Sequence, residues 1–412
     1  MSLLHPKRTL TALVPLYVSR FACIGPDCED NCCTGWRVNL DKKTFNAYRQ
    51  VKLPALAERL DKQVKRQRSQ ASDDNYARIE LDATSHECPF LEQRLCAVQS
   101  DLGEDYLSNI CATYPRTSRD FNGQLEQSLT LSCPEAARQA LLQPDAFDFV
   151  ETPLQVRTAT VASIKPKFGL SLSTMNEIRV FCLQLLRTDG LELWQKLAVL
   201  GVFCERLTAT LQQAGHAGIP ALLQDFVAMV ESGMVLDALR ELQPNHEIQA
   251  QVFALLWQGK LSVRLSPVQH SVQKAVALGL GADPVSGQVT SEQLLEHYRS
   301  GLYRLAEAMQ AAPHLLEHYL LNEIFRDLFP FQGATPYEDY LMLISRFGLL
   351  RLMLAARCNA DAELPSAQEL SQTVQVFCRR FQHDNSWAVQ VNTALKNSGW
   401  DGLEKVYGFL RT

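Results

Sequence analysis

Cysteines are the residues of this sequence whose number and spacing point most directly to chemistry. The chain has 412 residues and twelve cysteines, eight of which lie in its first third. These eight are Cys23, Cys28, Cys32, Cys33, Cys88, Cys96, Cys111 and Cys133. Core packing does not concentrate cysteines in this way, because a buried cysteine acts only as a small hydrophobic side chain. We therefore expect these sulfurs to bind a metal or to be cross-linked.

Chain length and compartment separate these two possibilities. Disulfide frameworks are typical of small secreted domains, whereas this chain is long and 46% hydrophobic. A signal peptide is not expected, because Pro15 interrupts the apolar run before Cys23, and Arg20 and Phe21 stand where a cleavage site needs small residues. The sequence has no run of about 18 apolar residues that predicts a transmembrane helix. We expect a cytoplasmic protein, in which clustered cysteines are metal ligands.

Net charge argues against nucleic acid as a partner. The formal charge is −5 at pH 7, which gives no general attraction to a polyanion. The basic run 62–68 is interpreted as the solvated face of a helix.

The spacing of the cysteines leaves the metal open. Thiolates bind Zn²⁺ tetrahedrally or hold an iron–sulfur cluster. Zinc sites usually show two short Cys-x2–4-Cys pairs, but the first group here is Cys-x4-Cys-x3-Cys-Cys. Neighbouring side chains of an extended chain point in opposite directions, so Cys32 and Cys33 are hard to aim at one ion. One cluster with spare cysteines, or two sites of four ligands, both fit the count.

Short elements are expected to position these cysteines. Turn residues between the first four predict a loop. A helix is expected over 41–60, with Asp41 as its cap. Asn122-Gly123 predicts a tight hairpin, and Pro134 suits the first turn of a helix.

The rest of the chain changes in character. Residues 143–167 contain three prolines and few apolar repeats, so a linker is expected over 146–168. Between 169 and 412, apolar residues recur at spacings of three and four, which predicts successive helices. The expected fold class is mainly α: a cysteine-rich α+β metal-binding domain over 1–145, followed by an all-helical domain over 169–412.

Several motifs resemble one known family, the flagellin lysine N-methylases of enteric bacteria. The resemblance covers essentially the whole chain, and its cysteine-rich third also resembles a broader group of zinc- or iron-chelating domains. The segments that carry it are Tyr17–Trp36, Asp41–Phe45, Cys88–Cys96, Cys111–Arg116, Leu131–Arg138 and Asn322–Phe331.

This resemblance implies a function and a cofactor. It implies methyl transfer from S-adenosylmethionine to lysine ε-amines of flagellin in the cytosol. It also implies an oxygen-sensitive [4Fe-4S] cluster on the cysteine-rich motif, with zinc as the alternative. Ligand roles are carried over first onto Cys23, Cys28, Cys32 and Cys33. The next candidates are Cys88, Cys96, Cys111 and Cys133.

Lysine methylation has its own chemical requirements. A protonated lysine has an unperturbed pKa near 10.4 and is a poor nucleophile, so the reaction needs a base and in-line alignment. We favour polar over radical transfer, because nitrogen already has a lone pair and the cysteine spacing differs from the usual Cys-x3-Cys-x2-Cys of radical enzymes. A conventional methyl-donor site would show a Gly-rich loop between strand and helix. The one candidate, 278–283, is interpreted as a helix end, so the donor site and the catalytic residues stay unknown.

A rival signal is the sequence His314-Leu-Leu-Glu317-His318. Two histidines four residues apart share a helix face and can bind Zn²⁺, with Glu317 as the base of a peptidase. An ordinary amphipathic helix explains the pattern better.

Other single residues have weaker functional interpretations. His86 is a candidate fourth ligand of a mixed site, and Trp36 is expected to cover the metal loop. Glu323 and Asp327 lie one helical turn apart beside aromatic residues and can receive a lysine, although solvated acids beside a core stripe are the simpler interpretation. A non-catalytic zinc- or iron-binding interaction module is the alternative function, and the oligomeric state stays open.

Overall fold

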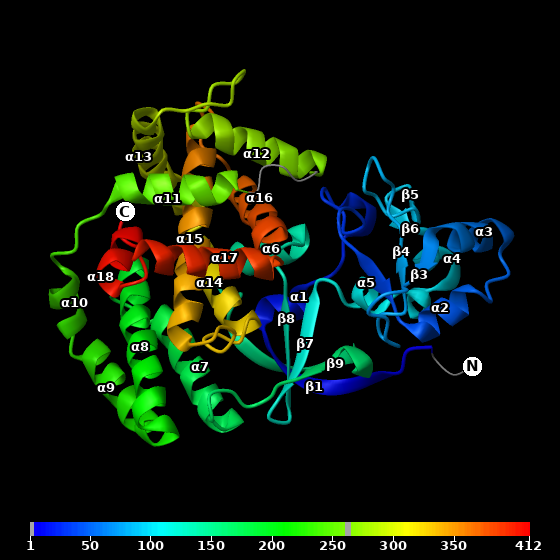
Figure 1. Cartoon of the computed structure of the whole chain (residues 1–412), viewed down its shortest axis with the longest axis horizontal. Helices are drawn as coiled ribbons and strands as arrows, with labels where there is room; N and C mark the ends of the chain where they lie inside the picture. The colour runs from blue at the N-terminus through cyan, green and yellow to red at the C-terminus, as the bar shows by residue number, and fades with distance from the viewer. Residues whose placement is uncertain (1–3, 260–264) are drawn as a thin grey trace.

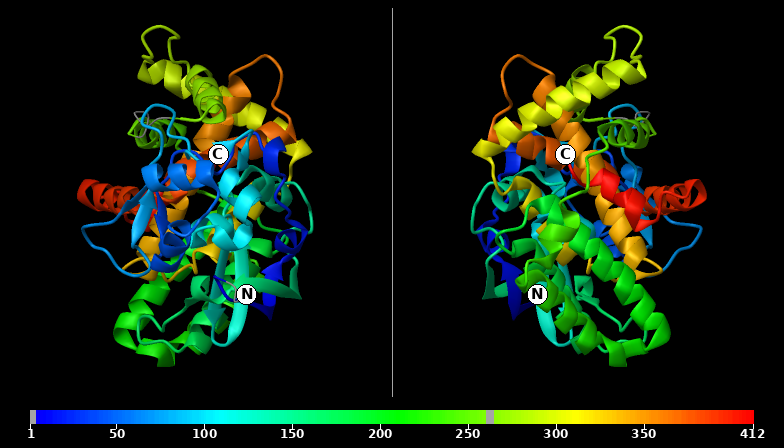
Figure 2. Two further views of the ribbon diagram at one scale, coloured as in Figure 1. Left: turned by 90° about the vertical axis from the view of Figure 1, so that its right-hand side faces the viewer. Right: turned by 90° about the vertical axis from the view of Figure 1, so that its left-hand side faces the viewer.

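The computed structural model describes residues 4–259 and 265–412, apart from the side chains of residues 235, 236, 238, 385, 386 and 388. Figure 1 shows a small module rich in cysteine, a sheet beside it and a large group of helices. Figure 2 views the molecule from the module side and from the helical side. In the part of the chain that is described, no helix is long and apolar enough to cross a membrane.

The main sheet has five strands in the order β10-β7-β8-β1-β9. They are β1 (Lys7–Pro15), β7 (Arg116–Phe121), β8 (Gln124–Leu129), β9 (Phe149–Arg157) and β10 (Ala162–Ser163). β1 runs parallel to β8, with Ala12 opposite Leu125, and antiparallel to β9. Asn122 and Gly123 join β7 to β8 with φ angles of 56° and 83°, the left-handed backbone that a two-residue hairpin needs. The expected hairpin is present.

The segment expected to be a linker belongs to this sheet. β9 lies within 146–168 and pairs along all of β1, from Lys7 opposite Arg157 to Pro15 opposite Phe149. Its side chains are mostly exposed or half-buried, so the sequence shows little apolar periodicity there. One large core runs from Ala12 to Leu410, and a second, small core lies within 38–107. The two cores therefore divide inside the N-terminal third rather than at residue 145.

The small core belongs to residues 22–113, which we call the cysteine-rich module. Asp41 caps α2 by accepting the Thr44 N–H at 2.9 Å. The helix expected over 41–60 is two helices, because Pro54 has no N–H to continue the first and begins the second. The elements of the module are η1 (Gly25–Asp27), β2 (Val38–Leu40), α2 (Lys42–Tyr48), α3 (Pro54–Gln63), β3 (Val64–Arg66), β4 (Ala77–Ile79), β5 (Leu91–Glu92), β6 (Leu95–Cys96), α4 (Ala97–Leu102), η2 (Glu104–Tyr106) and α5 (Asn109–Thr113).

The remaining described elements are almost all helical, which confirms the expected fold class. Two short helices, α1 (Leu16–Arg20) and α6 (Pro134–Leu141), pack together beside the sheet. The others are η3 (Thr158–Thr160), α7 (Leu172–Arg187), α8 (Leu193–Gln213), η4 (Gly215–Gly218), α9 (Ile219–Glu231), α10 (Met234–Leu239), α11 (His246–Gln258), α12 (Pro267–Gly279), α13 (Ser291–Ala308), η5 (Met309–Ala311), α14 (Leu315–Arg326), α15 (Pro336–Asn359), α16 (Ala367–Phe377), η6 (Cys378–Gln382), α17 (Asn385–Ser398), α18 (Leu403–Val406) and η7 (Tyr407–Phe409).

One irregular turn interrupts the helical pattern near the C-terminus. α16 continues directly into η6, which is a π-helical turn. Single π-helical turns are rare and occur frequently at functional sites. The apolar periodicity over Ser366–Gln382 predicts an uninterrupted helix, and the π-helical turn was not anticipated.

The Gly-rich segment 278–283 closes a helix, as expected. α12 ends at Gly279, and Gly281 has a φ of +82°. A Cβ at Gly279 would lie 1.8 Å from the Ala356 carbonyl oxygen. The glycines therefore end α12 and let it approach α15, and they form no strand-to-helix phosphate loop.

A buried carboxylate joins the sheet to the helices. Glu126 of β8 accepts hydrogen bonds from Arg119 Nε at 2.9 Å and from Arg179 Nη2 at 2.9 Å. Each of the three side chains is at most 5% exposed. Arg119 also donates to the carbonyl oxygens of Phe325 and Arg326 at the end of α14. Glu126 thus pairs with two guanidiniums at the point where β8, α7 and α14 meet.

We expect Glu126→Gln to be strongly destabilising. Removing one partner from a buried ion pair costs about 3–5 kcal/mol, because the remaining charge stays buried without compensation. Urea unfolding followed by circular dichroism measures the difference. Glu307→Gln, on the exposed face of α13, is the control and should change the unfolding free energy by about 0.5 kcal/mol or less. Equal stability of the two variants would contradict the structural role of Glu126.

Candidate functional site

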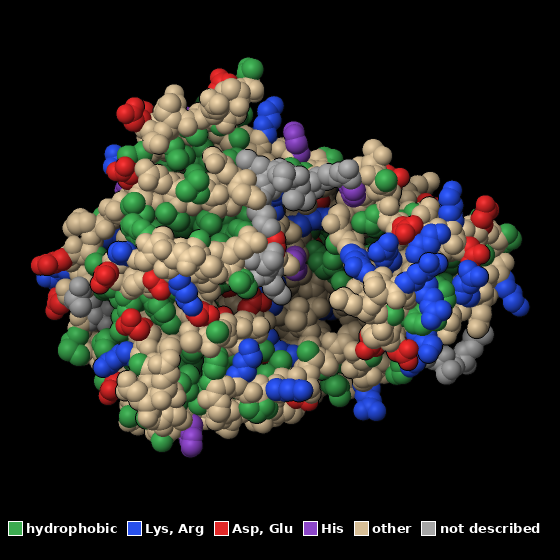
Figure 3. All heavy atoms as spheres, in the orientation of Figure 1, with side chains coloured by type: hydrophobic (Ala, Val, Ile, Leu, Met, Phe, Trp, Pro, Cys, Tyr) green, Lys and Arg blue, Asp and Glu red, His purple; other side chains and the backbone are tan. Residues whose placement is uncertain are grey.

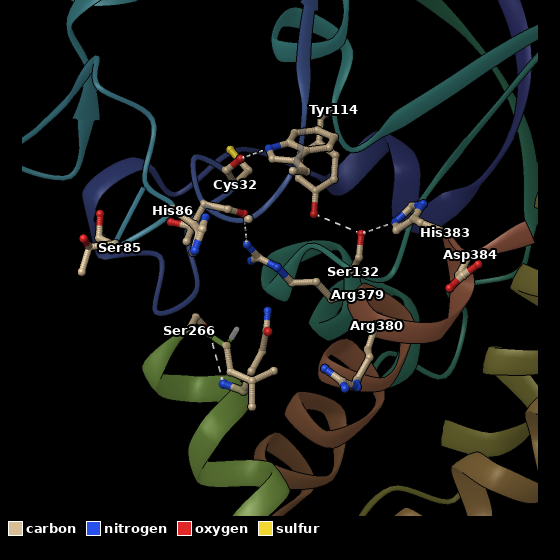
Figure 4. Close-up of a pocket in the computed structure, with 16 residues that line it drawn as sticks. Cys32, Ser85, His86, Tyr114, Ser132, Ser266, Arg379, Arg380, His383 and Asp384 are labelled. Carbon is tan, nitrogen blue, oxygen red and sulfur yellow. Dashed lines mark hydrogen bonds between the residues drawn. The ribbon is translucent and has the colours of Figure 1, made fainter. Parts of the chain in front are cut away.

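A cavity of about 660 Å³ lies where the cysteine-rich module meets the helices. Figure 3 shows the surface hollowed between these two parts, and Figure 4 shows the side chains that line the cavity. The module contributes one side, and α12 with η6 contributes the other. The lining residues used below are Cys32, Trp36, Tyr114, Ser132, Arg379, Arg380 and His383. We call this space the junction cavity.

The helical side holds the cysteine loop in place through Arg379. This residue forms an ion pair with the buried Asp30 carboxylate at 2.9 Å. It also donates to the backbone oxygens of Asn31 at 3.0 Å and Thr34 at 2.9 Å. Gln375, one turn earlier on α16, donates to the same Asp30 carboxylate at 2.9 Å. The loop that carries Cys28, Cys32 and Cys33 is therefore fastened to the π-helical turn.

Cys32 is the cysteine of this group whose pKa is lowered. A hydrogen bond from the Cys33 thiol lowers the pKa of Cys32 to about 7, and the Arg379 guanidinium contributes to this decrease. The same hydrogen bond, followed by burial, raises the pKa of Cys33. Burial raises the pKa of the other nearby thiols, and the Cys32 thiolate adds to the increase in each of them. These are Cys28, Cys88, Cys96, Cys111 and Cys133. The charge on Cys32 therefore affects the pKa of six of the other seven predicted ligands.

Backbone groups support several of these sulfurs. Cys88, Cys96 and Cys133 accept hydrogen bonds from backbone N–H groups two or three residues later in the chain. Hydrogen bonds to a charged form stabilise it, so these sulfurs are suited to act as thiolates. Cys23 is exposed, and it lies near Arg116, which is also close to Cys133. Among the described residues, no three His, Cys, Asp or Glu side chains are close enough together to hold a single metal ion.

A chain of polar contacts crosses the floor of the junction cavity. Trp36 donates to the Cys32 carbonyl oxygen at 2.5 Å and packs edge-on against Tyr114, with ring centroids 4.9 Å apart. Tyr114 Oη lies 3.1 Å from Ser132 Oγ, which lies 3.0 Å from His383 Nε2. These contacts are visible in Figure 4. Trp36 therefore covers the cysteine loop, as the sequence predicted.

Arg380 supplies unused donors at the same cavity. Its Nε and Nη2 atoms are buried and have no hydrogen-bond partner in the described part of the chain. Burial lowers the pKa of this guanidinium. An arginine fork matches a carboxylate or a phosphate in geometry and charge. The junction cavity is therefore suited to a ligand with an anionic group.

A second cavity, of about 620 Å³, lies on the other side of the π-helical turn. It is lined by α14, α15 and α17 and by Gln382, which immediately precedes His383. Its walls include Glu323 and Asp327, the carboxylates that sequence analysis singled out. We call it the acidic cavity.

The geometry does not support the peptidase interpretation. His318 is 4% exposed, and its Nδ1 is bonded to the Ala140 carbonyl oxygen at 2.9 Å. Burial lowers the pKa of His318 to about 4, so the ring is neutral and enclosed. Glu317 forms an ion pair with Lys196 at 2.9 Å. His314 stacks on His318 with centroids 5.3 Å apart, which is the packing of an ordinary helix face.

Comparison with known proteins now assigns the chain to a family. A family model, the FliB lysine N-methylase C-terminal domain, matches residues 179–409. The chain belongs to the FliB lysine N-methylase family. It is similar to the lysine-N-methylase of Salmonella typhimurium, with 24% identity over 92% of this chain and 94% of that protein.

Two further relatives extend the comparison. The lysine-N-methylase of Salmonella choleraesuis is 24% identical over the same shares of the two chains. The flagellar biosynthetic protein FliU of Salmonella muenchen is 34% identical over 34% of this chain and 82% of that protein. No solved structure matches the chain. Membership of the FliB family identifies the chain as an enzyme, a lysine N-methyltransferase.

Sequence reasoning missed the helical half of the site in this FliB-family chain. Arg379, Arg380, Gln382 and His383 belong to no recognisable motif, and they follow a helix whose apolar pattern looks ordinary. The one local signal is the adjacent pair Arg379-Arg380, because a regular helix directs neighbouring side chains about 100° apart. Only the fold brings these residues against the cysteine loop.

Proposed function

We propose that this protein transfers methyl groups from S-adenosylmethionine to lysine ε-amines of flagellin, with a [4Fe-4S] cluster bound by the cysteine-rich module. One observation carries the proposal: Cys32 belongs both to the cysteine group and to the wall of the junction cavity. The names of the relatives support the substrate, since they are lysine-N-methylases and a flagellar biosynthetic protein. The proposed location is the cytosol, where flagellin is made.

The residues of the junction cavity fit the methyl donor. S-adenosylmethionine carries a carboxylate, an aromatic base and a sulfonium, and when bound it supplies the methyl group. The free donors of Arg380 suit the carboxylate. Trp36 and Tyr114 offer aromatic faces against which the base can pack. With these contacts to its carboxylate and its base, the methyl donor needs no Gly-rich strand-to-helix loop.

The cysteines fit a cluster better than a single zinc ion. A tetrahedral zinc site places its sulfurs about 3.8 Å apart, because each Zn–S bond is about 2.3 Å long. A cluster distributes its thiolates over separate irons and holds them farther apart. No three candidate ligands in the described ranges meet the spacing of a single ion, yet the charge on Cys32 acts on six other thiols. The ligands would come from these seven and Cys23.

The chain must also prepare the lysine. The attacking nitrogen has to lose a proton, so that its lone pair forms the C–N bond while the methyl–sulfur bond breaks and its electron pair stays on sulfur. Direct displacement requires the nitrogen, carbon and sulfur to be in line. The protein therefore has to bring the lysine and the donor together from opposite sides and to supply an acceptor for the proton.

Anaerobic purification with iron, sulfide and zinc analysis, followed by a methylation assay, tests this function. We expect about four irons and four sulfides per chain, the content of one such cluster. With flagellin and labelled S-adenosylmethionine, we expect label on flagellin lysines. Zinc alone in an active protein would overturn the cluster. Binding of flagellin without any methyl transfer by the iron-loaded protein would favour a non-catalytic interaction module.

A further inference from the structure

The acidic cavity has an unusual charge balance for an interior space. Four carboxylates line it, together with only two cations. Asp327 is paired with Arg326 at 2.7 Å and with Arg346 at 3.4 Å, and Glu338 is paired with Lys396. Asp339 accepts hydrogen bonds from backbone N–H groups. The fourth carboxylate is Glu323, which lies deepest.

Glu323 faces this cavity with one oxygen unused. The side chain is 2% exposed, and its Oε1 accepts a hydrogen bond from Gln382. Its Oε2 has no hydrogen-bond partner in the described part of the chain. Two cations lie near this carboxylate: Arg346 Nη1 is 3.6 Å from Oε2 and Arg326 Nη2 is 3.7 Å from Oε1, both beyond hydrogen-bond distance. A buried acceptor without a partner is destabilising, so a ligand that donates to it gains a favourable hydrogen bond.

A second unused acceptor lines the same cavity. Asn392 Oδ1 of α17 is buried and has no partner in the ranges that the structure describes. The amide nitrogen of Asn392 donates to the Glu338 carbonyl oxygen at 3.2 Å, which fixes the oxygen as the free atom. The junction cavity presents unused donors on Arg380, whereas the acidic cavity presents unused acceptors.

An alkyl ammonium matches this lining. It has three donors, no acceptor and a positive charge. Phe329, Met342 and Leu343 also line the cavity, and they can cover the aliphatic stem of a lysine, which buries its methylenes against apolar surface.

We propose that the acidic cavity is the acceptor site, which receives the side chain of the substrate lysine and holds its ε-ammonium against Glu323 and Asn392. This inference rests on the proposed function and assigns a second, separate subsite to it. The entering ammonium donates to Oε2 of Glu323, the oxygen that Gln382 leaves unused.

The position of the two cavities suits the reaction. Gln382 lines the acidic cavity, and its neighbour His383 lines the junction cavity. Thr130 Oγ1 connects them, because it donates to Gln382 Oε1 at 3.0 Å and lies 3.0 Å from Ser132 Oγ. The turn thus forms a thin wall between the two spaces. A lysine in the acidic cavity and a donor in the junction cavity thus lie on opposite sides of this turn, and methyl transfer requires the turn to move so that nitrogen, carbon and sulfur come into line.

The acidic cavity also contains a proton acceptor. Burial raises the pKa of Glu323, and this effect outweighs the opposing effect of the Arg326 and Arg346 guanidiniums. Burial likewise raises the pKa of Asp339 to about 6. The ammonium gives one proton to the Glu323 carboxylate, which leaves the amine neutral with a free lone pair. The glutamic acid formed then releases its proton to solvent through the cavity.

Glu323→Gln tests the acceptor site, because it keeps the shape of the side chain and removes its charge. Equilibrium binding to the holoprotein uses a fluorescent flagellin peptide that contains one lysine, and the same peptide with norleucine in its place. For the lysine peptide we expect the dissociation constant to rise about 10- to 100-fold, the loss of one hydrogen bond to a charged group. The norleucine peptide should bind weakly and equally to both proteins.

Two further variants keep this test decisive. Glu317→Gln lies on the same helix but outside both cavities, and it should bind like the wild type. Asn392→Ala removes the second acceptor and should weaken binding of the lysine peptide about 3- to 10-fold, even where Glu323→Gln loses its iron or its helical content. Unchanged lysine-peptide affinity in folded variants, with active wild-type enzyme, would overturn the acceptor site and leave the methylase intact.

Discussion

Replacing Cys32 by serine is expected to remove most of the iron from the protein and to abolish methyl transfer. Six other thiols respond to the charge on Cys32, and Cys32 is the thiol of this group whose pKa is lowered, so it is the sulfur best suited to act as a thiolate ligand. Its backbone is also fixed, because its carbonyl oxygen accepts the Trp36 indole N–H. A serine oxygen is a poor substitute for a thiolate, the ligand on which iron–sulfur clusters depend.

The measurement is iron and sulfide content after anaerobic reconstitution, together with the absorbance of the protein. We expect the iron content to fall from about four to below about one per chain. Cys358→Ala is the matched control, since Cys358 is fully buried in α15 and far from the module in sequence. It should keep its iron. A Cys32→Ser protein with full iron content and full activity would remove Cys32 from the site.

The elements of the fold were largely predictable, because their signals are local. Asp41 caps α2 through its own side chain, and Asn122-Gly123 forms its turn with its own backbone. The helices after residue 169 follow from apolar spacing alone. β9 was not predicted, because only two of its nine side chains are buried and its stability comes from pairing with β1, more than 130 residues earlier.

One half of the site was also predictable from local signals, and the other half was not. The eight cysteines can be recognised in the sequence by their density, and Trp36 can be recognised by its place beside them. The helical half carries no such signal, because Arg380 and Gln382 are ordinary residues at the end of an amphipathic helix. Their importance comes from the π-helical turn and from Arg379, which contacts a loop about 350 residues away. Glu323 looked like a solvated acid in the sequence and is instead a buried one with a free oxygen.

Replacing Arg380 by glutamine is expected to weaken binding of S-adenosylmethionine about 10- to 100-fold, which corresponds to one charge-assisted hydrogen bond. The two buried donors of this guanidinium have no partner in the described residues, and they lie at the wall of the junction cavity. Its neighbour Arg379 already uses its donors on the cysteine loop. Arg380 is therefore the side chain best placed to bind the carboxylate of the methyl donor.

Equilibrium dialysis of labelled S-adenosylmethionine against the iron-loaded protein, without flagellin, separates this role from catalysis. Arg240→Gln serves as the control, because Arg240 lies on the surface and pairs only locally with Asp237. Iron content and helical circular dichroism should match the wild type in both variants, since Arg380 forms no ion pair on which the fold depends among the described contacts. Equal affinity in the wild type and in Arg380→Gln would place the donor carboxylate elsewhere, and the acidic cavity would then have to be tested for the donor as well as for lysine.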